Sequence, residues 1–120
     1  MNLIKQFKKT RDNYVINQVE KAVIPDFKKS ETVRYHIIFK GRVQHIGFRL
    51  ETEEFSKRLG FTGWIRNTDD NNVETEIQTE KDKLDFFIDF MNNLKRIKIK
   101  ELDKKSIPLK ENETEFIVIK

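Results

Sequence analysis

The segment best suited to do chemistry is a short loop flanked by glycines, Gly41-Arg42-Val43-Gln44-His45-Ile46-Gly47-Phe48-Arg49. It falls between a predicted strand and a predicted helix. At such a junction backbone N–H groups lack partners, and the helix N-terminus adds about half a positive charge. The junction therefore favours an anion. Gly41 and Gly47 allow the backbone to curl and to approach a ligand closely.

Arg49 is the charged side chain that indicates which anion would bind. It falls in the first turn of the predicted helix, where a cation opposes the helix dipole, and a bound anion would relieve that conflict. Its guanidinium fork matches the oxygens of a phosphate group in a bidentate way. The residues alone leave a second interpretation open, in which a glycine-containing loop is followed by a solvated arginine and no ligand binds.

A second candidate residue, Asn67, ends the segment Gly63-Trp64-Ile65-Arg66-Asn67. Its side-chain amide can hold a water molecule, because it donates and accepts hydrogen bonds at once. Asparagine is also a favoured turn residue, and taken alone that structural role is the commoner one.

The elements that must position these residues follow from the apolar pattern. Alternating residues predict strands, and apolar residues three and four apart predict helices. Right-handed crossovers place both helices on one side of the sheet. The predicted fold class is therefore α+β, a ferredoxin-like α/β sandwich. Two helices would cover one face of a mixed or antiparallel sheet of about five strands. The predicted strands are 33–40, 61–67, 73–79, a lysine-protected edge strand near 97–100, and 116–120, and the predicted helices are 48–59 and 81–94.

The chain divides near Pro25 into a basic N-terminal extension, residues 1–31, and a folded domain, residues 32–120. Apolar residues in 2–23 recur at helical spacing and predict one or two amphipathic helices. Because the domain's elements close without it, we expect the extension to be dispensable for catalysis. Its apolar side needs cover, and packing on its own domain or self-association through residues 1–31 is favoured over a membrane or nucleic-acid role.

Composition excludes several classes of protein. The chain has no cysteine and two histidines, which excludes thiolate chemistry and leaves no clustered ligands for a metal. Basic residues exceed acidic ones by three in residues 1–31 and by only one in the domain, so no nucleic-acid partner is expected for the domain. No apolar run is long enough to span a bilayer, and the absence of cysteine fits a cytoplasmic location.

Residues 32–120 resemble the acylphosphatase family. Residues 41–49 match its signature Gly-x-Val-Gln-Gly-Val-x-Phe-Arg, and residues 63–67 with Val73 match its second signature, Gly-aromatic-aliphatic-basic-Asn followed by a turn and valine. The two motifs stand in the family's order and on the expected elements. The extension has no counterpart in the resemblance.

The resemblance implies a hydrolase that needs neither metal nor cofactor and cleaves acyl phosphates to a carboxylate and inorganic phosphate. The substrate would be a small molecule, and phosphate would be product and inhibitor. Carried over by position, Arg49 binds the phosphoryl group and Asn67 orients the attacking water. The backbone cradle for phosphate would comprise Gln44, His45, Ile46, Gly47 and Phe48.

One departure from the family leaves alternatives open. His45 stands where the family has glycine, so it either strains the loop or adds a donor to the phosphate. A weakened loop would make the chain a catalytically weak or inactive anion-binding or regulatory domain. A third hypothesis is an adaptor that binds nucleic acid or a membrane surface through residues 1–31.

Overall fold

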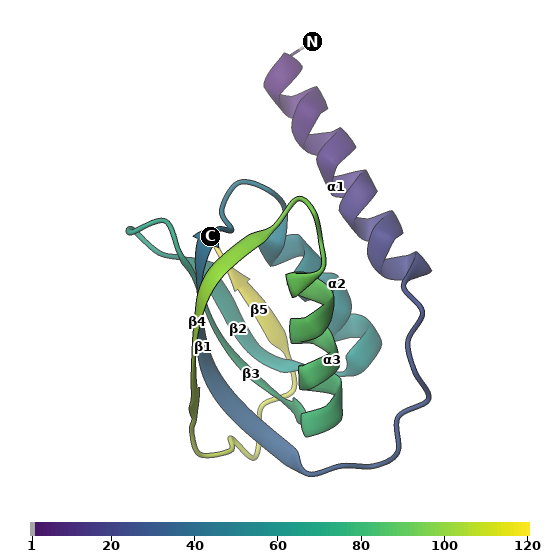
Figure 1. Ribbon diagram of the computed structural model, residues 1–120, viewed down its shortest axis with the longest axis vertical. Coiled ribbons are helices and arrows are strands. Elements are labelled where there is room, and N and C mark those ends of the chain that lie inside the picture. Colours follow the sequence, from purple (N-terminus) through teal and green to yellow (C-terminus); the bar gives the residue numbers. More distant parts are fainter. Residues whose placement is uncertain (1) are drawn as a thin grey trace.

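The computed structural model describes residues 2–120 as one five-stranded sheet with two helices on one face and a third helix packed beside them (Figure 1). The predicted fold class is confirmed. The elements in chain order are α1 (Leu3–Lys21), β1 (Thr32–Arg42), α2 (Phe48–Leu59), β2 (Thr62–Asn67), β3 (Val73–Glu80), α3 (Lys81–Asn92), β4 (Lys98–Ser106) and β5 (Phe116–Ile119).

The strands are ordered β4-β1-β3-β2-β5, and every pair is antiparallel except β2 with β5. Alternation along β1 buries Ile37 and Phe39 under the helices. The lysine-rich edge strand is longer than the sequence predicted, because β4 pairs with β1 as far as Ser106 although most of its side chains are exposed. Such an edge is protected from further pairing by its charges.

Aromatic side chains form the centre of the core between the helices and the sheet. The ring of Phe55 on α2 lies edge-on to Phe87 and Phe90 of α3, with centroids 5.6 and 4.7 Å apart. Edge-to-face contacts of this kind are favourable beyond the area they bury. This packing fixes α2 over the sheet, and with it the helix N-terminus that the first motif precedes.

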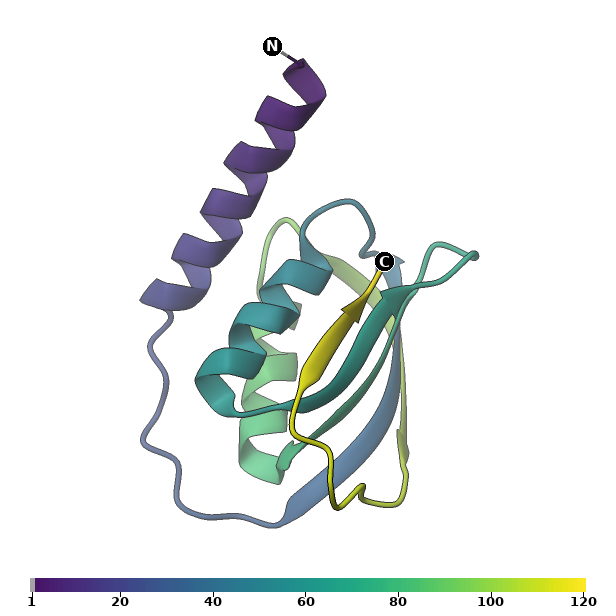
Figure 2. The ribbon, with the colours of Figure 1, turned by 180° about the vertical axis from the view of Figure 1, so that it is seen from behind.

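The N-terminal extension forms one helix, α1, that packs on α2. Val15 and Val19 are buried in this contact. Arg58 of α2 donates to the carbonyls of Val19, Glu20 and Ala22 at the end of α1, where helix carbonyls lack partners of the regular helical pattern. The other end of α1 projects beyond the sandwich (Figures 1 and 2), and its large apolar side chains are exposed, namely Leu3, Ile4, Phe7 and Tyr14.

On the face of the sheet away from the helices, Arg34 holds a charged cluster. Its buried guanidinium pairs with Glu76 at 2.9 Å and with Glu113 at 2.6 Å, which ties the connection between β4 and β5 to the sheet. Burial raises the pKa of Glu113, but the hydrogen bonds from Arg34 outweigh that effect and hold the pKa below its usual range. The cluster therefore stabilises the fold most when Glu113 is ionised.

We predict that Arg34→Met lowers the free energy of unfolding by about 3 kcal/mol, because it leaves partly buried carboxylates unpaired. Urea unfolding measures the loss, and Lys81→Met, which breaks the exposed pair with Asp85, is the control and should cost far less. Because the pKa of Glu113 is lowered in the folded state, the wild-type advantage should be complete above about pH 4.3 and shrink as pH falls further. Equal losses in the two variants would contradict this role for Arg34.

Candidate active site

The first motif forms the turn that joins β1 to α2. Gly47 is the N-cap of α2 and has a φ of 85°, a left-handed conformation that glycine adopts without strain. Gly41 differs from expectation. A Cβ on Gly41 would lie 2.2 Å from the carbonyl oxygen of Lys98, so its missing side chain permits the pairing of β1 with β4 rather than the approach of a ligand.

The backbone N–H groups of this turn are unpaired. Within residues 2–120, no group accepts a hydrogen bond from the amides of residues 44–47. No side chain caps α2 either, because its N-cap is a glycine. Residues 44–47 are half-buried or exposed, so an anion at the positive end of the helix can take the place of the water that their amides would otherwise bind. We call residues 44–48 the cradle.

Two arginines hold the carbonyl groups of the cradle. Arg96 donates from Nε to the carbonyl of Ile46 at 2.7 Å, and Arg11 of α1 donates to the carbonyl of His45 at 3.4 Å. In a trans peptide the C=O and the following N–H point in opposite directions. Each of these bonds therefore also sets the direction of the next amide in the cradle.

A buried carboxylate keeps Arg96 in place. Glu51 is fully buried in α2 and pairs with Arg96 at 2.7 Å. Burial raises the pKa of Glu51, and the contact with Arg96 opposes that rise. A third bond, 2.9 Å long, runs from Arg96 to the side-chain oxygen of Gln18 on α1. The cradle is thus connected through Arg96 to both α1 and α2.

The side chain of Gln44 holds the cradle from the other side. Its amide donates to the carbonyls of Thr68 and Asn72 at 2.8 and 2.7 Å. These two residues belong to the turn between β2 and β3, directly after Asn67. Gln44 therefore fixes the distance between the two motifs.

Arg49 and Asn67 line one cavity of about 560 Å³ together with the cradle residues His45, Gly47 and Phe48. Arg49 donates to the carbonyl of Ile119 at 3.2 Å, so β5 holds its guanidinium. Gln44 and Ile46 do not line the cavity. Their side chains turn to the β2–β3 hairpin and to the hydrophobic core, and what they offer to the site is their free amides.

Helix α1 contributes side chains that the sequence did not predict for the site. Lys8, Arg11 and Asp12 line the same cavity. Basic residues on a helix usually face solvent, and nothing in the sequence places a residue at position 11 beside one at position 45. The sequence predicted an extension that is dispensable for catalysis, and the structure places three of its side chains in the lining of this cavity.

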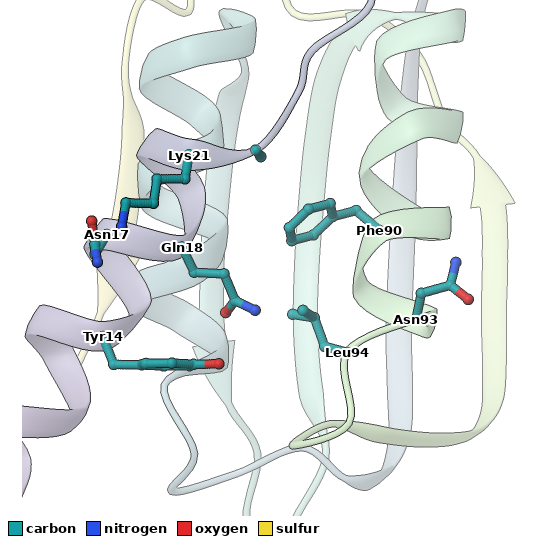
Figure 3. Close-up of a pocket in the computed structure, with 8 residues that line it drawn as sticks. Tyr14, Asn17, Gln18, Lys21, Phe90, Asn93 and Leu94 are labelled. Carbon is teal, nitrogen blue, oxygen red and sulfur yellow. The ribbon is translucent and has the colours of Figure 1, made fainter.

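A second cavity, of about 510 Å³, lies between α1 and α3 (Figure 3). It is lined by Tyr14, Phe90 and Leu94 with amide side chains around them, and Lys21 is the one charged residue in its lining. It offers no set of free amides to an oxyanion. Of these two cavities, the first is therefore the one suited to an oxyanion.

Neither cavity contains an obvious site for a metal ion. Across residues 2–120, no three side chains of histidine, cysteine, aspartate or glutamate lie close enough together to hold one. Over the same residues, none of the helices combines the length and the apolar character that crossing a bilayer requires.

Comparison with known proteins identifies the class. The acylphosphatase family model matches residues 35–118, and the chain belongs to the acylphosphatase family. The acylphosphatase of Pediococcus pentosaceus is 40% identical over 85 residues, which cover 69% of this chain and 93% of that protein. The crystal structure of acylphosphatase from Bacillus subtilis superposes with a TM-score of 0.66 at 26% identity, covering 73% of this chain and 99% of that one.

Other matches are shorter. The acylphosphatase of Geobacillus kaustophilus is 41% identical over 56 residues, or 47% of this chain. For this and the next two curated relatives the chain spans only 54–60% of their length. Helix α1 lies outside the residues that the family model matches.

His45 has a φ of 64°, so the position where the family has glycine does require a left-handed backbone here. We predict that His45→Gly relieves strain of about 1 kcal/mol and maintains or raises kcat/KM for an acyl phosphate. The control is Asn71→Gly, which relieves a similar φ of 68° in the β2–β3 turn and should leave kcat/KM unchanged. A fall in kcat/KM for His45→Gly alone would show instead that the imidazole assists the reaction.

Proposed function

We propose that the protein hydrolyses acyl phosphates to a carboxylate and inorganic phosphate, with the phosphoryl group bound in the cradle. The observation that carries this proposal is the run of free amides at residues 44–47 beside the guanidinium of Arg49. Family membership supports the same activity. In this proposal residues 32–120 form the catalytic domain.

In the proposed mechanism, one group of residues stabilises negative charge and another positions the attacking water. The cradle amides and Arg49 bind the phosphoryl oxygens and stabilise the charge on them in the transition state. Asn67 donates to and accepts from a water molecule and orients it in line with the bond to be broken. The water oxygen bonds to phosphorus while the bond from phosphorus to the acyl oxygen breaks. The acyl group leaves as a carboxylate, and the proton of the water passes to solvent.

A good leaving group explains why so few residues suffice. A carboxylate leaves readily, so the site needs neither a strong general base nor a metal. The substrate is a small molecule, and inorganic phosphate is both product and inhibitor. The absence of cysteine supports a cytoplasmic location. The alternative, an anion-binding domain without activity, shares the cradle and differs only in turnover.

We predict that the protein hydrolyses benzoyl phosphate in the presence of EDTA, and that Arg49→Ala abolishes both turnover and inhibition by phosphate. Arg49→Lys should recover little, because an ammonium group cannot reproduce the bidentate fork. Steady-state kinetics measures both effects. Near-normal kcat/KM in Arg49→Ala would place the reaction elsewhere. If the unaltered protein binds phosphate but shows no turnover, the inactive alternative is favoured. If EDTA abolishes activity and a divalent ion restores it, the metal-free mechanism is contradicted.

Asn67→Ala should separate catalysis from binding. We predict that kcat falls by about two to three orders of magnitude, because only the placement of water is lost, while the inhibition constant for phosphate stays within about twofold. The same assay in the presence of phosphate measures both values. A large loss of phosphate affinity would assign Asn67 to binding instead.

A further inference from the structure

Helix α1 contacts the cradle directly through two side chains and indirectly, by way of Arg96, through a third. Arg11 donates to the carbonyl of His45. The side chain of Val15 fills the space beside Gly47, where an added Cβ would come within 2.8 Å of it. Gln18, which extends from α1 into the gap facing α3 (Figure 3), accepts the hydrogen bond from Arg96 that was described above.

We propose that α1 is a working part of the active site and that Arg11 is a positioning residue, which holds the cradle in its anion-binding conformation through the carbonyl of His45. This inference rests on the proposed function. It assigns a role to a helix that lies outside the family-matched residues 35–118. The extension is then required for full phosphate affinity.

The geometry of the peptide unit explains how Arg11 acts. Fixing the carbonyl of His45 fixes the amide of Ile46, because the two belong to one planar trans peptide and point in opposite directions. Arg96 does the same for the next peptide through the carbonyl of Ile46. Two successive amides of the cradle are thus oriented by arginines, one from α1 and one from the segment after α3.

The guanidinium of Arg11 is itself held in position. Its Nε and one terminal nitrogen both donate to Oδ1 of Asp12, at 3.1 and 2.9 Å, and its side chain is 27% exposed. A fixed and partly shielded donor orients an acceptor better than a mobile one. The carbonyl that it holds belongs to His45, whose left-handed backbone is strained for a residue with a side chain. Arg11 therefore compensates for the histidine that replaces the family's glycine.

The first experiment measures binding of inorganic phosphate to the full chain by isothermal titration calorimetry. We expect Arg11→Ala to weaken binding about tenfold, the effect of one hydrogen bond to a charged group, and Arg11→Lys to recover part of the loss. Lys9→Ala removes the same charge from an exposed position that does not line the cavity, and it should stay within about twofold. An Arg11→Ala protein that binds phosphate as Lys9→Ala does would overturn the proposal.

Two further variants separate positioning from simple attraction between charges. Asp12→Ala removes a negative charge from the cavity and also removes the oxygen that holds the guanidinium of Arg11. Positioning therefore predicts weaker phosphate binding, whereas attraction alone predicts tighter binding. In a His45→Gly background the loss caused by Arg11→Ala should shrink to about twofold, because glycine adopts the left-handed conformation unaided. Tighter binding in Asp12→Ala, or an undiminished tenfold loss in the glycine background, would overturn the proposal.

Arg49→Ala distinguishes a failure of this inference from a failure of the proposed function. If Arg49→Ala abolishes phosphate binding while Arg11→Ala does not weaken it, the cradle is correct and only the role of α1 is wrong. If phosphate binding survives Arg49→Ala, the proposed site itself is wrong, and this inference is overturned with it.

Discussion

The structure of this site depends on leaving four consecutive backbone amides without a partner among residues 2–120. Because these amides make no hydrogen bonds within that part of the chain, the turn from β1 to α2 must be held by other contacts. Those contacts involve its carbonyls and side chains rather than its N–H groups. An anion that binds there gains four donors and a helix N-terminus that need no rearrangement.

The supports come from distant parts of the chain. Gln44 attaches the turn to the β2–β3 hairpin, and Arg96 holds it from the segment after α3, where buried Glu51 anchors the arginine. Arg11 adds a contact from α1. Because each support is a side chain bound to a backbone carbonyl, the amides remain free. The hydrophobic core then serves the site indirectly, by fixing α2 and the hairpin relative to each other.

Much of this fold follows from local patterns in the sequence. Alternation and helical spacing predicted every strand and helix, because those patterns report which side of each element meets the core. The two motifs likewise placed Arg49 and Asn67 in one cavity, as the structure shows. The predicted end of β4 was six residues short and that of α3 two residues long, since pairing along an edge and fraying at a helix end depend on neighbours more than on the local sequence.

What the sequence did not predict are contacts between residues far apart in the chain. The bond between Arg11 and His45 has no local signal, and neither does the pairing of Arg96 with Glu51. The role of Gly41 was also misjudged, because the backbone that it accommodates is that of β4 rather than a ligand. Tertiary contacts of this kind set the backbone conformation that a recognisable motif adopts in one particular chain.

A titration of the ¹⁵N-labelled protein with inorganic phosphate, followed by NMR, tests most directly whether the free amides of the cradle bind phosphate. We expect the largest chemical-shift changes at the backbone amides of residues 44–48 and at the Nε–H of Arg49. Residues that line the second cavity, between α1 and α3, such as Tyr14 and Phe90, should show only small chemical-shift changes. Shifts that concentrate in that cavity, or cradle amides that do not respond to phosphate, would contradict the account.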